Sequence, residues 1–275
     1  MSTRILTRPS PSQQTAPGRR RRSPLLRRLA IMVTLPLLLA AFALWWFVLR
    51  HDTPSAVSLD QALSGIEASA PTTTAATGAT ATDPSTPAAP TVLPTDGTWK
   101  IDRTITNAQG TGSFAGFRID EVLVGVGSTT AVGRTTTVDG SITASGSTLT
   151  AAQVSVGLTD ITTNDSRRND AVQRALSTSR YPEATFVLTQ PVNVGSVPTS
   201  GQKIDVAATG DLTIKGVTQT VTIDLQAQLQ GDVLVVVGSA PVVLADYGVT
   251  APTAPVVASV ADHGAFEFQL YFKKG

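Results

Sequence analysis

The sequence of 275 residues contains no cysteine, which excludes disulfides, thiolate chemistry and cysteine-ligated zinc. Histidine is almost as scarce, with His51 and His263 only, so any histidine-dependent mechanism in the C-terminal half would depend on His263 alone. Residues 97–275 also hold only ten aromatic side chains. The interior of that region must therefore be built mainly from aliphatic residues.

Acidic residues are absent from the N-terminal 28 residues, which carry eight arginines. Residues 97–275 reverse this balance, with twelve Lys/Arg against fifteen Asp/Glu. A mildly acidic C-terminal region gives no electrostatic reason to expect nucleic acid as a partner.

A continuous apolar run of 21 residues, 29–49, contains no charge and as a helix would span roughly 30 Å, the thickness of a bilayer core. Trp45, Trp46 and Phe47 lie near its end, where aromatic side chains favour the membrane interface. We predict one transmembrane signal-anchor helix. A cleaved signal peptide is the alternative, with Ala41 and Ala43 as the nearest cleavage site.

The arginines before this run predict its orientation. By the positive-inside rule they place residues 1–28 in the cytoplasm, as a disordered basic tail, and residues after Arg50 outside the cell membrane. Residues 50–96 are rich in Thr, Ala, Pro and Ser, a composition that buries too little apolar surface to fold. We predict a disordered linker there, with a reach on the order of 40 Å.

From residue 97 onward, apolar and polar residues alternate with the period of two that is typical of half-buried strands. Segments 206–214 and 217–225 predict a hairpin with a tight turn at Lys215-Gly216. The last strand places Phe266, Phe268, Leu270 and Phe272 on its apolar face, with Glu267 and Gln269 opposite. Further strands are expected near residues 119–126, 136–143, 149–158, 185–190 and 233–244.

About eight such strands fit a closed antiparallel barrel or a sandwich. One helix interrupts them: Asn164 or Asp165 is the predicted N-cap of a short helix that ends at Ser177.

No pattern indicates catalysis, a metal or a cofactor, so we predict that the protein is not an enzyme. His263 follows Asp262, but a triad would also need a nucleophile elbow, which is absent. Gly110-x-Gly112 and Gly125-x-Gly127 lack the strand–turn–helix context of a nucleotide loop and indicate turns or bulges.

An eight-stranded barrel is near the size at which side chains either fill the lumen or leave room for one small ligand. The inward positions are mostly Val, Ala, Gly, Leu and Ile, which favours a dry apolar cavity. The pattern alone leaves a filled core equally open.

Six motifs in order resemble those of the YceI family. They are GTWKID (97–102), GSFAGF (112–117), VGRTTTVDG (132–140), the pair DSRRND (165–170) and YPEATF (181–186), GDLTIKGVT (210–218), and DYG (246–248). The resemblance covers residues 97–275. The chain departs from the family where many members have a His-Ser pair, at Arg103-Thr104, and an early histidine on the next strand is also absent.

The resemblance implies an extended lipocalin-like barrel in the bacterial envelope, with a tunnel for a polyisoprenoid, an isoprenoid quinone or another long-chain lipid. The expected tunnel residues are Phe114, Phe117, Phe186, Leu212, Ile214, Val221, Ile223, Phe266 and Phe268. Arg167, Arg168 and Tyr181 are candidates for a polar head group at the rim. The alternative function is an envelope protein-interaction module with a filled barrel and no ligand. The oligomeric state is left open.

Overall fold

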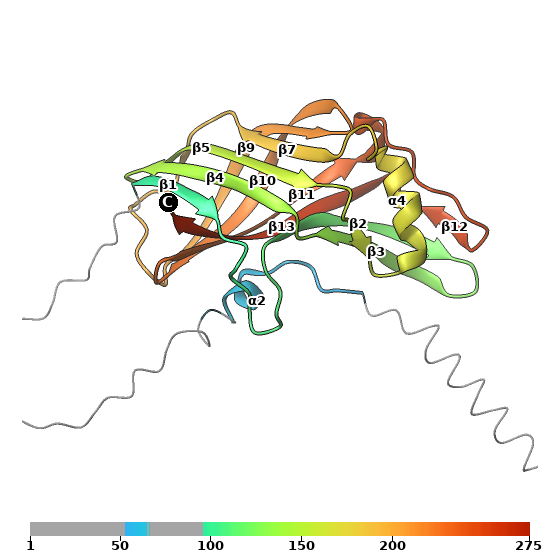
Figure 1. Cartoon of the computed structure of the whole chain (residues 1–275), viewed down its shortest axis with the longest axis horizontal. Helices are drawn as coiled ribbons and strands as arrows, with labels where there is room; N and C mark the ends of the chain where they lie inside the picture. Colours follow the sequence, from blue (N-terminus) through green and yellow to red (C-terminus); the bar gives the residue numbers. More distant parts are fainter. Residues whose placement is uncertain (1–52, 65, 67–95) are drawn as a thin grey trace, which may run out of the picture. The chain divides into compact units, whose positions relative to one another are not determined.

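The structure, a computed structural model, describes residues 53–64, Ile66 and residues 96–275, which belong to one compact unit (Figure 1). No helix among these described residues has the length and apolar character needed to span a bilayer. The predicted membrane span, 29–49, the basic tail, 1–28, and most of the predicted linker lie outside the described residues.

The unit is built around a ring of eight strands, each paired antiparallel with its neighbours. In ring order they are β1 (Gly97–Ile101), β4 (Val138–Ser145), β5 (Thr148–Gly157), β7 (Glu183–Leu188), β9 (Lys203–Ile214), β10 (Val217–Gln230), β11 (Val233–Val243) and β13 (His263–Lys274). The ring closes where β1 pairs with the last residues of β13. The predicted closed barrel is thereby confirmed.

The long strand β13 changes partner along its length. Its final residues pair with β1, whereas residues 265–269 pair with β2 (Phe114–Leu123). β2 continues into β3 (Gly127–Thr135) as a hairpin that extends the sheet beyond the ring. Three short strands complete the sheet: β6 (Thr162–Thr163) pairs with β3, β8 (Val192–Asn193) with β5, and β12 (Val257–Val260) with β2.

Local sequence patterns account for most of these elements. The predicted hairpin is β9–β10, whose turn residues Lys215 and Gly216 both have positive φ, 54° and 76°, as a type I′ turn requires. The predicted strand at 119–126 is wrong in its extent, because residues 124–126 form the turn between β2 and β3. Gly125 and Gly127, with φ of 79° and 99°, supply the backbone conformations of this turn.

The predicted helix after Asp165 is present in two parts, the 3-10 turn η1 (Ser166–Arg168) and the helix α4 (Asn169–Leu176). Asp165 is the N-cap, and its carboxylate accepts a hydrogen bond from the Arg167 backbone N–H at 3.1 Å. Val172 and Leu176 pack against Leu158, Ile161 and Ala184, so α4 covers the end of the barrel where β5 ends and β7 begins.

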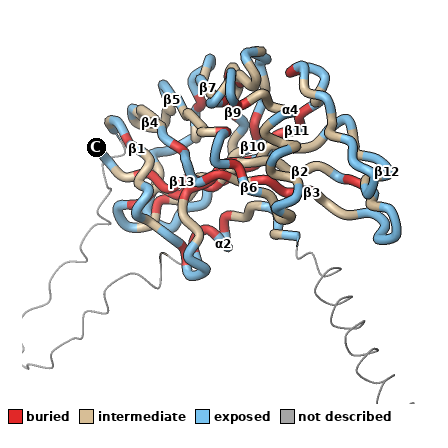
Figure 2. The backbone as a smooth tube through the Cα atoms, turned by 45° about the vertical axis from the view of Figure 1, so that its right-hand side comes forward, coloured by how far each residue is buried: buried red, intermediate tan, exposed pale blue. Residues whose placement is uncertain are grey.

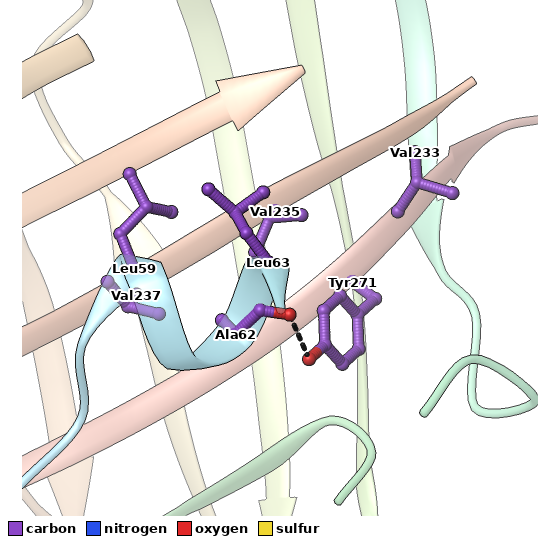
Figure 3. Packing of buried hydrophobic residues seen from close by; sticks show 7 residues of the cluster. All are labelled: Leu59, Ala62, Leu63, Val233, Val235, Val237 and Tyr271. Atoms are coloured by element: carbon purple, nitrogen blue, oxygen red, sulfur yellow. Dashed lines mark hydrogen bonds between the residues drawn. The ribbon is translucent and has the colours of Figure 1, made fainter. Parts of the chain in front are cut away.

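The predicted linker contains a folded segment, which corrects its expected boundary. Residues 53–64 and Ile66, which we call the docked segment, include the helix α2 (Leu59–Leu63), whose N-cap Ser58 accepts a hydrogen bond from Gln61 N–H at 3.3 Å. Leu59, Ala62 and Leu63 are buried against the outer surface of β11 and β13 (Figure 3). The apolar side chains of this segment stabilise its short helix by packing against the sheet.

Candidate functional site

A cavity of about 200 Å³ lies inside the barrel. Its walls come from the inward residues of all eight ring strands, such as Trp99 of β1, Ile142 of β4, Val154 of β5, Val236 of β11 and Leu270 of β13. No lining residue carries a charge, and the polar side-chain groups among them are the hydroxyls of Ser147, Thr148 and Thr185 and the indole N–H of Trp99. Such a cavity is suited to an apolar guest.

The two ends of the cavity differ. Loop residues border one end: the β4–β5 turn with Gly146 and Ser147, and the segment that contains Val194 and Pro198. At the other end Ala184, Phe186, Leu212 and Phe266 line the cavity, and the apolar side chains under α4 and around Tyr247 pack beyond them. Loops thus border the cavity at one end, and packed apolar side chains border it at the other.

Two glycines make room for the aromatic rings that line the cavity. A Cβ at Gly210 would lie 2.4 Å from Cζ of Phe186, and one at Gly238 would lie 2.5 Å from Cζ of Phe268. Both distances are too short for non-bonded carbon atoms, so larger residues at either position would displace these rings.

Five of the nine predicted tunnel residues line the cavity: Phe186, Leu212, Ile223, Phe266 and Phe268. Each belongs to a ring strand in which alternate residues point inward. Their contact with a ligand stays a prediction.

The other four predicted residues do not line the cavity. Phe117 and Ile214 pack with the cluster under α4, and Ile214 and Val221 also pack around Leu212, Val242 and Tyr247.

Phe114 lies on the opposite face of the sheet. It is buried, it is paired in register with Gln269, and the Arg134 guanidinium lies 4.3 Å from the centre of its ring. Phe114 and Phe117 are three residues apart in β2, so they lie on opposite faces of the strand, and the prediction that both line the tunnel could not hold.

Alternation also predicts lining residues beyond the nine expected tunnel residues. Leu270 and Phe272 continue the inward series of Phe266 and Phe268, and Leu225 and Leu229 continue that of Ile223. The loop residues Val194 and Pro198 had no such signal, since they belong to no strand.

The three predicted rim residues do not border the cavity. The Arg167 guanidinium binds the Asp165 carboxylate at 2.6 Å, and this hydrogen bond lowers the pKa of Asp165 to about 2. Arg168 pairs with the buried Glu121 carboxylate and donates to Asn164 Oδ1 at 2.9 Å. Tyr181 contacts the β9–β10 turn, where a Cβ on Gly216 would lie 2.6 Å from its ring. In this structure, both arginines pair with carboxylates of the chain itself, so the geometry gives them a structural role.

A buried ionic cluster lies on the outer face of the barrel, under the docked segment. Glu267 is 1% exposed, and its carboxylate accepts two hydrogen bonds from Arg134, at 2.6 and 3.0 Å, with Arg118 3.8 Å away. Strand alternation predicts Glu267 and Gln269 on the face opposite the apolar one, which in a half-buried strand is exposed to solvent. That expectation is wrong, because the docked segment and neighbouring residues cover this face (Figure 2).

The backbone of the docked segment completes this cluster. Arg118 donates to the Pro54 carbonyl at 2.7 Å, Arg134 donates to the Ser55 carbonyl at 2.8 Å, and Val57 N–H donates to Glu267 at 3.4 Å.

Tyr271 fixes the helix of the same segment. Its hydroxyl donates to the Ala62 carbonyl at 3.0 Å and accepts from Gln269 at 3.0 Å (Figure 3). Burial raises the pKa of Tyr271 to about 12.

Asp262 and His263 form an exposed pair at the start of β13, with 2.7 Å between Asp262 Oδ1 and His263 Nδ1. This hydrogen bond lowers the pKa of Asp262. Neither residue lines the cavity, and the described residues contain no group of His, Asp and Glu that could hold a metal ion.

Comparison with known proteins gives one family. The model of the YceI-like domain family matches residues 99–272. Protein YceI of Escherichia coli O157:H7 is 38% identical over 81 residues, and Protein YceI of Shigella flexneri matches to the same extent. These matches cover 29% of this chain and 38% of each relative, so the chain spans well under half the length of these curated relatives.

Two solved structures are also similar. A polyisoprenoid binding domain from Saccharophagus degradans, described as implicated in plant cell wall breakdown, is 18% identical with a TM-score of 0.49, covering 64% of this chain and 98% of that domain. BcnA of Burkholderia cenocepacia is 21% identical with a TM-score of 0.43, covering 57% of this chain and 95% of that protein.

Proposed function

This chain belongs to the YceI family, and from that premise we propose that it is a membrane-tethered binding protein that holds a long-chain apolar lipid in its barrel. The ligand is of the polyisoprenoid or isoprenoid-quinone type, as the family resemblance implies. The observation that supports this proposal is the uncharged cavity of about 200 Å³ inside the ring of eight strands.

The energetics favour such a ligand. Each CH₂ group removed from water contributes about 0.8 kcal/mol, so burial of several isoprene units offsets the cost of ordering the chain. The cavity exceeds the roughly 150 Å³ of an engineered apolar void that binds benzene, and is smaller than the 300–1,000 Å³ of typical ligand pockets. A long chain therefore requires a wider barrel or extends beyond the cavity.

The same proposal includes the location. Residues 29–49 have the length and apolarity of a membrane span, and the arginines before them favour a cytoplasmic N-terminus. The barrel would then lie outside the cytoplasm, beside the bilayer from which an apolar ligand must come.

Mass spectrometry of organic extracts from the purified full chain tests the proposal. We expect one class of long-chain lipid in near-stoichiometric amount. Ala208 and Ala207 are adjacent in β9, but Ala208 lines the cavity while Ala207 is exposed on the outer face. Ala208→Phe should abolish lipid recovery, whereas the matched control Ala207→Phe should retain it. Equal recovery from both variants, or none from the native chain, would contradict the proposal.

Two other functions, a protein-interaction module and an enzyme acting on lipids, would require a different barrel interior. An interaction module with a filled barrel is inconsistent with the observed cavity. An enzyme acting on lipids would need a cluster of polar side chains in the lumen, and the cavity wall of the described barrel contains no charged residue.

A further inference from the structure

An apolar tip forms where the β2–β3 turn meets the loop before β12. Four of the seven large apolar side chains that are exposed in the described part of the chain gather there: Val122, Val124, Val126 and Val256. Val124 N–H donates to the Val256 carbonyl at 2.9 Å, so two segments about 130 residues apart in sequence lie side by side. Figure 1 shows this end of the hairpin beside β12, and Figure 2 shows its exposure.

The tip is free of charge over an unusually long stretch. Residues 122–133 and 249–261 contain no Asp, Glu, Lys, Arg or His. A Cβ on Gly125 or Gly127 would meet no atom within 4 Å, so the turn projects away from the rest of the fold. A contiguous exposed apolar patch of this kind marks an interaction site.

We propose that this tip inserts into the surface of the lipid bilayer. Its composition favours lipid, because the exposed side chains are aliphatic and no residue of the tip carries a charge. Short apolar side chains on a projecting turn gain free energy by entering the interfacial region of a membrane without any complementary pocket.

With the proposed membrane tether, the docked segment would hold the β2–β3 hairpin near the membrane. Its Pro54 and Ser55 carbonyls are held by Arg118 of β2 and Arg134 of β3, the hairpin that carries the tip. The predicted span ends at Leu49, five residues before Pro54, so a membrane tether would limit this attachment to roughly 17 Å from the bilayer. Along β2, Val124 is six residues beyond Arg118, or roughly 20 Å. This step rests on the proposed membrane tether, whereas the apolarity of the tip does not.

The absence of native cysteine permits single-site labelling of the full chain. An environment-sensitive dye is attached to Val124→Cys, Val256→Cys or Ser196→Cys, and each chain is reconstituted into phosphatidylcholine–phosphatidylglycerol vesicles that contain a nitroxide-labelled lipid. Ser196 is an exposed loop residue next to the loop end of the cavity. Dyes at 124 and 256 should shift to the blue and lose emission, and the dye at 196 should do neither.

A fourth label, Ala40→Cys, reports the predicted span separately. Quenching at 40 without quenching at 124 and 256 would overturn the tip proposal and leave the anchor intact. Quenching at 124 and 256 without quenching at 40 would support the tip and contradict the anchor. Equal quenching at 124, 256 and 196 would also overturn the proposal, because it would indicate contact without orientation.

A charge variant provides the second measurement. Val124→Asp combined with Val126→Asp should abolish the quenching of the dye at 256, while the circular dichroism spectrum of the barrel stays unchanged. Undiminished quenching in this folded variant would contradict insertion of the tip.

Discussion

The inner and outer faces of β11 and β13 differ in how their side chains are packed. Inward residues such as Val236, Leu270 and Phe272 border an open cavity, whereas outward residues such as Glu267 and Tyr271 are buried under the docked segment. The side chains of the inner face are apolar and do not fill the barrel interior. The outer face combines apolar packing with buried ion pairs, and its central side chains are almost completely buried.

Because of this difference, we expect the outer face to determine the stability of the barrel and the inner face to determine ligand binding. A cavity lacks the dispersion contacts that a filled core would supply, so the inner face stabilises the barrel less than a solid core would. The outer face supplies a compact cluster of Leu59, Ala62, Leu63 and three valines of β11, together with the charges around Glu267. Substitutions on the outer face should therefore affect stability, and those on the inner face should affect ligand binding.

The largest effect is expected from Glu267→Ala in residues 51–275. The change leaves Arg118 and Arg134 without a buried carboxylate, and it should lower the free energy of unfolding by about 2–4 kcal/mol. Urea denaturation measures it. The control is Asp139→Ala, which breaks an exposed pair with Arg103 and should have almost no effect. Equal effects of the two substitutions would show that the buried cluster contributes no more than a surface pair.

Leu59→Ala should release the docked segment while leaving the barrel folded. Leu59 is 2% exposed, and truncation of a buried leucine costs about 2–3 kcal/mol, so backbone amides of the segment should exchange hydrogen roughly 30- to 150-fold faster. The exchange of the β9–β10 amides should not change. The control, Val122→Ala at an exposed position, should alter neither. Faster exchange throughout the barrel would mean that the segment and barrel unfold together.

The same substitution on each face compares the two regions directly. Ala62→Leu overpacks the filled outer face and should destabilise the protein by about 1–3 kcal/mol. Ala208→Leu projects into the cavity and should change stability by less than about 1 kcal/mol while weakening lipid binding. Thermal denaturation and lipid extraction measure the two quantities. Equal destabilisation by both would mean that the cavity is closed in solution.

The barrel could be predicted because its signals are local. Alternation over 203–214 and 217–230, with a turn at Lys215-Gly216, determines a hairpin without reference to the rest of the chain. The position of Phe114 could not be predicted in this way. Alternation separates Phe114 from Phe117 onto opposite faces of β2, but only the register with β13 shows which face is the inner one.

The docked segment was missed because the composition of its surroundings hid it. Ser58 followed by Leu59, Ala62, Leu63 and Ile66 is an N-cap with apolar residues at i, i+3, i+4 and i+7, a short helical pattern. The composition of residues 50–96 as a whole is dominated by Thr, Ala, Pro and Ser, so it does not reveal this short pattern. The docked segment packs on the outer face of β11 and β13, which is more than 160 residues away in sequence. This contact can therefore be recognised only in the folded structure.

The smallest effect on the free energy of unfolding is expected from removal of the Tyr271 hydroxyl, which hydrogen-bonds the outer face of the barrel to the docked segment. Tyr271→Phe removes the hydrogen bond to the Ala62 carbonyl and should cost about 1 kcal/mol at neutral pH. The control is Tyr247→Phe, because the Tyr247 hydroxyl is buried without a hydrogen-bond partner among the described residues, and its removal should be neutral or slightly stabilising.

The contribution of the Tyr271 hydroxyl to the free energy of unfolding should also depend on pH. An unfolded tyrosine ionises near its ordinary pKa of about 10, whereas burial raises the pKa of Tyr271 in the folded protein to about 12. The folded state then holds the proton more tightly, so the contribution is complete below pH 10 and is lost as the pH rises toward 12. Urea denaturation of the native chain and the Tyr271→Phe variant between pH 8 and about pH 11 should show the stability difference shrinking with rising pH. A difference that stays constant across this range would contradict a buried, hydrogen-bonded hydroxyl at this contact.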